Sequence, residues 1–226
     1  MIAQIAPDLF HWTARHPEWH PGEWGAEVGS YAALTETELL VIDPLLPADE
    51  PDPVLAELDA RLAERVSILI TIGYHVRSTE ALWERWRGDV PVEIYGPPQA
   101  GRRLPGGARK AFRELEPADE GPAGARVFRI GRPVRGERPL WLPTHAALAF
   151  GDALVANPAG ELRMWDLEPL TEHRASFYRD RFAPTLRPML ELPVERVLVT
   201  HGAPILEDAA AALRRAVDSP PWFHRG

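Results

Sequence analysis

Histidine and acidic side chains stand at the ends of three apolar runs that predict strands. His75 and Arg77 lie in residues 71–78, directly after the first of these runs. Asp152 stands between two short apolar runs, and His201 follows the last one. Functional side chains of α/β sheets collect where strands run out into loops. We therefore expect these four side chains to converge on one site.

Two kinds of chemistry fit this set. His75, Asp152 and His201 would supply three protein ligands, the number that catalytic zinc commonly keeps beside one open position. Water bound to such an ion is a nucleophile near neutral pH, and the same three residues would then be catalytic. In the alternative, Asp152 and His201 hydrogen-bond each other without a metal, and His75 exchanges a hydrogen bond at the start of a helix. The sequence leaves both alternatives open.

Arg77 adds a positive charge next to a predicted helix N-terminus, which itself favours anions. Together they could hold a carboxylate or a phosphate by bidentate hydrogen bonds. The alternative is an internal ion pair between Arg77 and Asp43 or Asp152.

The elements that must position these residues follow from apolar periodicity. Strands are predicted at residues 9–13, 28–34, 39–42, 67–71, 92–95, 126–130, 140–142, 147–150, 153–156 and 196–200. Helices are predicted from about Pro53, over residues 79–87 with Ser78 as N-cap, around 177–190, and from about 206 to 217. In the first helix, Leu55, Leu58, Leu62 and Val66 repeat at helical spacing. Residues 98–124, rich in Gly, Pro and charge, are expected to be an irregular surface excursion.

Composition excludes several classes of function. The 226 residues include no cysteine, which rules out disulfides, cysteine-ligated zinc and thiol nucleophiles. A net charge of -8 argues against a nucleic-acid partner. The first residues do not resemble a signal peptide and no run is long enough to cross a bilayer, so a cytoplasmic location without a membrane partner is expected. The sequence contains no nucleotide-binding or serine-hydrolase motif.

The ordered set of motifs resembles the metallo-β-lactamase superfamily. Residues 40–44, with Asp43, are similar to its early strand, Phe150-Gly151-Asp152 to its metal-bridging aspartate segment, and Thr200-His201-Gly202 to its last histidine. The resemblance spans nearly the whole chain in order and spacing. It implies an α/β fold, an αββα four-layer sandwich of two mixed sheets with helices on the outer faces, formed by residues 1–226 as one domain.

The metal-binding motifs of that superfamily are degenerate in this chain. The superfamily's T-H-x-H-x-D-H motif can be aligned with this chain from Thr71. Its four metal-ligand positions then hold Ile72, Tyr74, Val76 and Arg77, none of which is a usual metal ligand. The mid-chain histidine falls near Pro133, and His145 lies too close to Asp152 in sequence to replace it. A site for two metal ions of the usual kind is therefore not expected. At most one zinc or other divalent ion is expected, and the metal-free alternative is favoured.

Residues 11–24 contain three histidines and three tryptophans. In the resembling family, the loop between early strands overhangs the active site, which implies that Trp19 could contact a substrate, as could Tyr74 and Arg77. The alternative is a loop sealed by tryptophan packing.

Two functions follow. The first is a hydrolase-like protein acting on a small ester, thioester or lactone, with His75, Asp152 and His201 as its site and Arg77 orienting an anionic group. The second is a non-catalytic member of the fold that binds a small anionic ligand or serves as an interaction scaffold, with self-association left open.

Overall fold

Apolar side chains of the N-terminal strands alternate between two cores, as the pleat of a β-strand requires. We describe the chain from a computed structural model that covers residues 1–20, 25–118, 120–131 and 136–224. In β4 (Glu38–Ile42), Leu39 and Val41 point into one core, and Leu40 and Ile42 point into the other. A strand buried on both faces must lie between two layers, which accounts for its nearly continuous apolar sequence.

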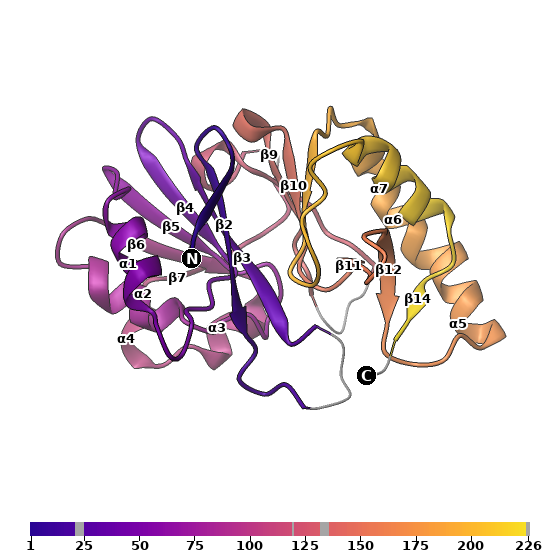
Figure 1. Cartoon of the computed structure of the whole chain (residues 1–226), viewed down its shortest axis with the longest axis horizontal. Coiled ribbons are helices and arrows are strands. Elements are labelled where there is room, and N and C mark those ends of the chain that lie inside the picture. The colour runs from indigo at the N-terminus through magenta and orange to yellow at the C-terminus, as the bar shows by residue number, and fades with distance from the viewer. Residues whose placement is uncertain (21–24, 119, 132–135, 225–226) are drawn as a thin grey trace.

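Three hydrogen-bonded sheets form the two inner layers (Figure 1). The first sheet has seven strands in sequence order: β1 (Ala3–Ala6), β2 (Leu9–Arg15), β3 (Glu27–Leu34), β4, β5 (Arg65–Leu69), β6 (Val92–Gly96) and β7 (Phe112–Glu114). The second has the order β13 (Arg196–Leu198), β10 (Ala147–Ala149), β9 (Leu140–Leu142) and β8 (Arg126–Val127). The third has the order β11 (Leu154–Ala156), β12 (Leu162–Asp166) and β14 (Trp222–Phe223).

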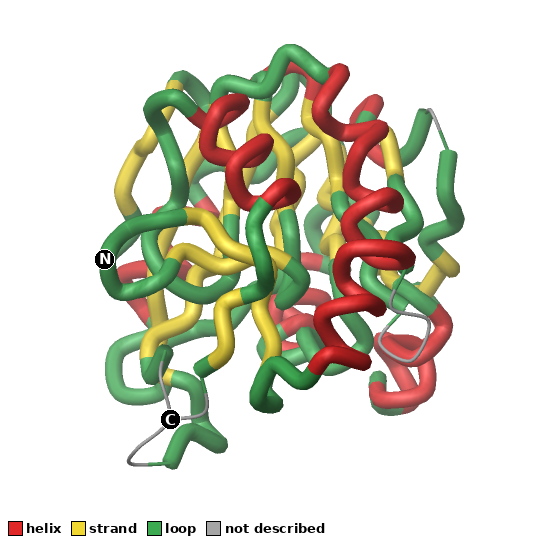
Figure 2. Tube along the Cα trace, turned by 90° about the vertical axis from the view of Figure 1, so that its right-hand side faces the viewer, coloured by secondary structure: helices red, strands yellow, loops and turns green. Residues whose placement is uncertain are grey.

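Helices form the two outer layers. Those on the side of the first sheet are α1 (Asp52–Asp59), α2 (Thr79–Trp86), α3 (Pro98–Arg103) and α4 (Gly106–Lys110). Those on the other side are α5 (Glu172–Phe177), α6 (Ala183–Leu186) and α7 (Ala209–Asp218). A π-helical turn (Tyr178–Phe182) joins α5 to α6, and 3-10 turns cover Pro122–Gly124, Pro143–His145 and Arg187–Glu191. Figure 2 shows this second helical layer lying across the outer side of the strands.

Within the described residues, three large hydrophobic cores lie between successive layers and confirm the predicted four layers. One core joins the outer face of the first sheet to the helices through residues such as Leu58, Leu82 and Trp86. A second lies between the sheets, where Leu40 meets side chains of the second sheet such as Leu198. The third core packs α5 to α7 against the second and third sheets. The architecture is therefore αββα.

The first helix ends earlier than the periodicity predicts. α1 ends at Asp59, and Val66, expected on this helix, lies in β5 instead. Backbone pairing explains the difference, because Arg65 opens a parallel ladder with β4 that a continued helix would abolish. Ser78 precedes α2 as predicted, but its hydroxyl accepts a hydrogen bond from the Leu46 backbone N–H at 2.9 Å rather than capping the helix.

Residues 98–124 are more ordered than predicted. They form α3, α4 and β7, and Pro98, Pro105 and Pro122 stand at the starts of short helices, as the fixed φ of proline allows. Ala100, Leu104 and Ala108 pack into the outer core. Four strands were not predicted: β1, β7, β12 and β14.

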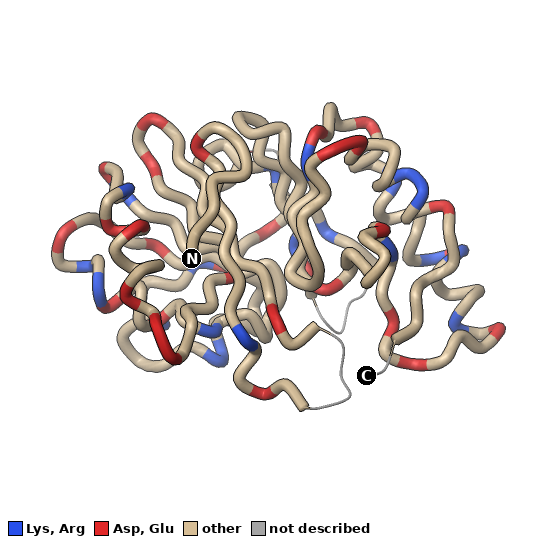
Figure 3. Tube along the Cα trace, viewed as in Figure 1, with Lys and Arg blue, Asp and Glu red and all other residues tan. Residues whose placement is uncertain are grey.

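Charged residues of both signs are interspersed over both halves of the molecule (Figure 3). No helix within the described residues has the length and apolar character needed to span a membrane.

Candidate functional site

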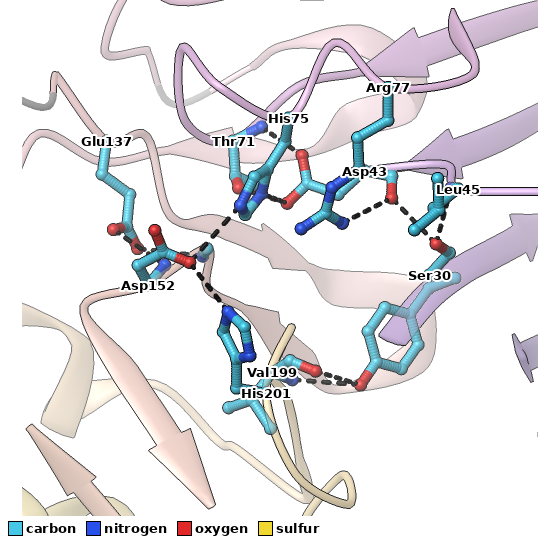
Figure 4. Close-up of polar contacts among 12 residues, drawn as sticks. Ser30, Asp43, Leu45, Thr71, His75, Arg77, Glu137, Asp152, Val199 and His201 are labelled. Carbon is cyan, nitrogen blue, oxygen red and sulfur yellow. Dashed lines mark hydrogen bonds and ion pairs between the residues drawn. The ribbon is translucent and has the colours of Figure 1, made fainter. Parts of the chain in front are cut away.

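The candidate site forms where two pairs of parallel strands end. β4 and β5 run parallel, and they lead into Asp43 and into residues 71–78. β10 and β13 also run parallel, and they lead into Asp152 and His201. Carboxyl ends of parallel neighbours meet at the same edge of a sheet, so four segments distant in sequence are brought together (Figure 4).

His75 lies at the centre of this network. Its Nδ1 is 2.9 Å from Asp43 Oδ2, and its Nε2 is 3.3 Å from Asp152 Oδ1. Burial and the nearby Arg77 favour the neutral ring, but the two carboxylates outweigh them and raise the pKa of His75 above its ordinary value. The geometry therefore favours an imidazolium that is hydrogen-bonded to Asp43 through Nδ1 and lies within ion-pair distance of Asp152 through Nε2.

Asp43 is fixed from several directions. One carboxylate oxygen accepts the Thr71 backbone N–H at 2.8 Å, and the other accepts the Thr71 hydroxyl and meets His75. The Asp43 carbonyl accepts the Ser30 hydroxyl at 2.9 Å. Asp43 adopts a left-handed backbone conformation, with φ of 46°, which aspartate tolerates better than most residues. This side chain is fully engaged in orienting the turn that carries His75.

Asp152 and His201 form the more accessible end of the network. His201 Nε2 is 3.7 Å from Asp152 Oδ1, and the two side chains are 11% and 12% exposed, against 5% for His75. Burial lowers the pKa of His201 to about 4, despite the opposing charge of Asp152. His201 is therefore a neutral imidazole near neutral pH. Its ring also packs against Trp165, with 5.1 Å between the ring centroids.

Glu137 supports the site from behind and was not found by sequence reasoning. Its buried carboxyl accepts the backbone N–H groups of Gly151, Asp152 and Ala153 at 2.9, 3.2 and 2.9 Å. Burial, reinforced by the charge of Asp152, raises the pKa of Glu137 to about 8. No motif marks this residue in the sequence, because its partners are backbone groups that any sequence provides.

Arg77 lies beside Asp43, but not in the ion pair with a carboxylate that one of the two alternatives predicted. Its Nη1 donates to the backbone carbonyl of Asp43 at 3.2 Å, rather than to a carboxylate. Its buried Nε makes no hydrogen bond within the part of the chain that the structure describes. Arg77 has a φ of 32°, in a region that non-glycine residues seldom occupy, so the backbone is held in an unusual conformation at this point.

These residues do not fit a metal ion in the arrangement described. Across residues 1–20, 25–118, 120–131 and 136–224, no three His, Asp or Glu side chains are grouped so that they could hold one. His75 faces a carboxylate through each ring nitrogen, and a ligand histidine would have to give up its proton. Arg77 adds a fixed cation beside Asp43. The assignment of His75, Asp152 and His201 as ligands stays a prediction.

The predicted substrate contacts Tyr74 and Trp19 each pack against an arginine. Tyr74 is 45% exposed, and the Arg103 guanidinium lies 4.9 Å from the centroid of its ring. The Arg15 guanidinium lies 4.9 Å from the centroid of Trp19. Their role in binding a substrate stays a prediction. Two predicted positions lie outside the described residues. One is Pro133, where the family's mid-chain histidine would fall, and the other is residues 21–24 of the histidine- and tryptophan-rich stretch.

His16 belongs to the same stretch and lies within electrostatic reach of the site. Burial and the charge of Arg77 lower the pKa of His16 below its ordinary value, and His75 adds to this, whereas Glu18 and Asp152 act in the opposite direction. Beyond the gap, Gly25 lies directly against the His201 ring, because a Cβ at this glycine would be 2.7 Å from His201 Nδ1. His16 and Gly25, which lie on either side of residues 21–24, therefore both approach the site.

Comparison of the sequence with protein-family models and with curated proteins finds no match. Solved structures, in contrast, are similar over nearly their full length. The DIM-1 metallo-β-lactamase superposes with a TM-score of 0.63 at 9% sequence identity, over 96% of each chain. A metallo-β-lactamase from Erythrobacter litoralis gives 0.63 at 14% identity, covering 96% of this chain and 94% of its own. The chemotaxis sensor ODP, solved as a peroxy diiron species, gives 0.61 at 12% identity, covering 98% and 96%.

The chain therefore has the metallo-β-lactamase fold. This confirms the fold predicted from the order of the motifs. At these identities the likeness concerns the fold alone, because one fold hosts many functions. What the chain does must be argued from its own site.

Proposed function

We propose that this protein is a metal-independent member of the metallo-β-lactamase fold that binds a small anionic ligand beside Arg77. The observation that carries this proposal is the position of His75 between two carboxylates, 2.9 Å from Asp43 and 3.3 Å from Asp152. Each carboxylate already has a cation of the protein itself next to it.

Charge balance supports a site without a metal. Asp43 and Asp152 contribute two negative charges, and protonated His75 and Arg77 contribute two positive charges. Glu137, with a pKa of about 8, adds little charge near neutral pH. Buried charges are tolerated when they are paired, and His75 lies within ion-pair distance of both carboxylates. A divalent ion would introduce charge that these residues have already compensated.

Arg77 and two neutral histidines support an anionic ligand. The guanidinium donates from Nη1 to the Asp43 carbonyl and to no carboxylate by a hydrogen bond among the described residues, so its positive charge could attract a carboxylate or phosphate. His16 and His201 have lowered pKa values and lie close enough to Arg77 for their charges to interact. An anion bound between them would favour their protonation, so binding should strengthen as the pH falls.

A second candidate function is hydrolysis of a small ester, thioester or lactone. It is favoured by one observation, the neutral His201 next to Asp152 at the accessible end of the network. His201 would accept a proton from a water molecule as its oxygen adds to the carbonyl carbon, and Asp152 would stabilise the resulting imidazolium.

Anion binding can be tested by titrating acetate and inorganic phosphate into ¹⁵N-labelled protein and following amide shifts. Shifts centred on residues 71–78 and 201–202 are expected, with affinity reduced about tenfold by Arg77→Gln, the loss of roughly one charged hydrogen bond. The matched control is Arg103→Gln, which removes an arginine stacked on Tyr74. Equal weakening by both variants, or no shifts near Arg77, would contradict the proposal.

Metal content and esterase activity of the same protein distinguish the two candidate functions. Near-stoichiometric zinc after purification without chelator, lost in His201→Ala, would contradict metal independence. Turnover of p-nitrophenyl acetate that survives chelator but disappears in His201→Gln would favour the hydrolase over the binding protein.

A further inference from the structure

Glu137 is a buried acid that accepts hydrogen bonds from the backbone of a loop distant in sequence. It precedes β9, and only 2% of its surface is exposed. Its carboxyl lies beside Asp152 (Figure 4), where it accepts the N–H groups of three consecutive residues, Gly151 to Ala153. The proposed anion site does not use this acid as a ligand contact. Its contribution must therefore come through the loop that it holds.

The loop at residues 151–153 is bent around this carboxyl. Three successive N–H groups can point at one acceptor only in a tight turn, and such a concave set of amides holds acidic groups in many proteins. Gly151 also lies directly against the end of the first sheet, because a Cβ there would be 2.7 Å from Thr71 Oγ1. The Asp152 side chain therefore leaves a backbone that is fixed on two sides.

The residue after Glu137 ties the same segment to the first sheet. The Arg138 backbone N–H donates to the Thr71 carbonyl at 2.8 Å. Thr71 in turn donates its N–H to Asp43 Oδ1 at 2.8 Å and its hydroxyl to Asp43 Oδ2. A continuous chain of hydrogen bonds thus connects the segment that carries Glu137 to Asp43.

His75 closes this chain into a ring, because it lies between Asp43 and Asp152 on the other side. We infer that Glu137 is a positioning residue, which fixes the spacing of the two carboxylates so that both face His75. Without the Glu137 carboxyl, the loop would lose three hydrogen bonds and Asp152 would move away from His75 Nε2. The inference rests on the proposed metal-independent site, because it concerns the contact between His75 and Asp152 that carries that proposal.

Ring-nitrogen NMR separates this role from a general contribution to stability. His75 Nδ1 faces Asp43 and Nε2 faces Asp152, so displacement of Asp152 should shift the Nε2 signal far more than the Nδ1 signal. Glu137→Leu removes every acceptor at similar volume, whereas Glu137→Gln retains one oxygen. At a pH low enough to protonate His75 in every variant, both should shift Nε2, and Glu137→Leu should shift it more.

Amide hydrogen exchange reports on the loop itself. The amides of residues 151–153 should exchange about tenfold faster or more in Glu137→Leu than in the unchanged protein, because each loses its acceptor. In Glu137→Gln the acceleration should be smaller, since one oxygen still accepts.

Glu38 supplies matched controls at the other end of β4 from the site. It is also a buried acid, 7% exposed, and its Oε1 accepts the Ser67 hydroxyl. Glu38→Leu and Glu38→Gln should lower the free energy of unfolding but leave both His75 signals and the amides of residues 151–153 unchanged.

An unchanged Nε2 signal in the folded Glu137 variants would overturn the inference, as would equal shifts in the Glu38 variants. If Glu137→Leu does not fold, Glu137→Gln compared with Glu38→Gln decides in the same way. Failure of the proposed function has a different signature, because acetate and phosphate would then cause no shifts near Arg77. The Nε2 signal is measured without any ligand, so the two failures are distinguishable.

Discussion

In the proposed metal-independent site, His75 would take the role of a cation between two carboxylates. It lies buried between Asp43 and Asp152, and Arg77 donates to the Asp43 carbonyl. A divalent ion satisfies carboxylates by coordination, whereas an imidazolium offers them an N–H from each ring nitrogen. Under this proposal the site would stay folded around its two carboxylates without an ion.

Asp43→Asn is expected to destabilise the protein strongly. The substitution removes the countercharge of His75 at a side chain that is only 2% exposed. Breaking one partner of a buried pair typically costs about 3 to 5 kcal/mol, because the remaining charge is uncompensated. The free energy of unfolding in urea measures the cost. Glu84→Gln is the control, since it breaks an exposed pair with Arg87 and should cost less than about 1 kcal/mol. Similar losses of unfolding free energy for both variants would show that the buried pair stabilises the fold no more than an exposed pair does.

The turn after β13 illustrates how an element positions a functional residue. Gly202 follows His201 with a φ of 83°, and a Cβ at this position would lie 2.1 Å from the Ala156 carbonyl oxygen. The His201 carbonyl in turn accepts the Ala156 N–H at 3.0 Å. The close approach of two backbones fixes where His201 leaves its strand, and only glycine permits it.

Gly202→Ala should therefore lower the free energy of unfolding by more than the backbone strain of an alanine at positive φ would by itself. We expect a loss of about 3 kcal/mol or more in the free energy of unfolding, because the alanine is strained at this φ and the backbone at Ala156 must also move away from the added Cβ. Gly160→Ala is the matched control: Gly160 has a similar φ of 78° but no atom within 4 Å of the added Cβ, and it should lose about 1 kcal/mol. Urea midpoints compare the two. Equal losses would mean that the contact with Ala156 does not constrain the turn.

The sequence predicted those elements whose signal is local. Buried strands such as β4 and β5 stand out by continuous apolar runs, and their ends located Asp43 and His75. β12 was missed although Leu162, Met164 and Asp166 are buried in alternation, because arginine and tryptophan between them obscure the pattern. Glu137 was missed for a different reason: its carboxyl accepts hydrogen bonds from backbone N–H groups of the loop at residues 151–153. Contacts of that kind exist only in the folded chain.

At the scale of the whole molecule, Tyr31 joins the two sheets. Its hydroxyl donates to the Val199 carbonyl at 2.7 Å and accepts the Val199 N–H at 3.1 Å, across 168 residues of sequence. Val28 and His201 also form a β-bridge between the halves. The site lies at this junction, so its geometry depends on both halves being folded together.

Tyr31→Phe tests whether residues 1–226 fold as one domain. The substitution leaves two buried backbone groups unpaired and should cost about 1 to 3 kcal/mol. A single unfolding transition is expected by both calorimetry and circular dichroism, before and after the change. Tyr95→Phe is the control, because its hydroxyl donates to Glu93 on the same strand and so does not join the two sheets. Two separated transitions would show that the halves fold independently.

The protonation state of His75 is the most direct test of the metal-independent site. Ring-nitrogen NMR of ¹⁵N-labelled protein at increasing pH should find that the pKa of His75 lies above its ordinary value, whereas His201 becomes protonated only as the pH falls toward about 4. One equivalent of zinc, added at a pH where His75 is protonated, should leave the His75 signals unchanged. A His75 whose pKa is not raised, and whose ring signals shift with that equivalent of zinc, would contradict the proposed site.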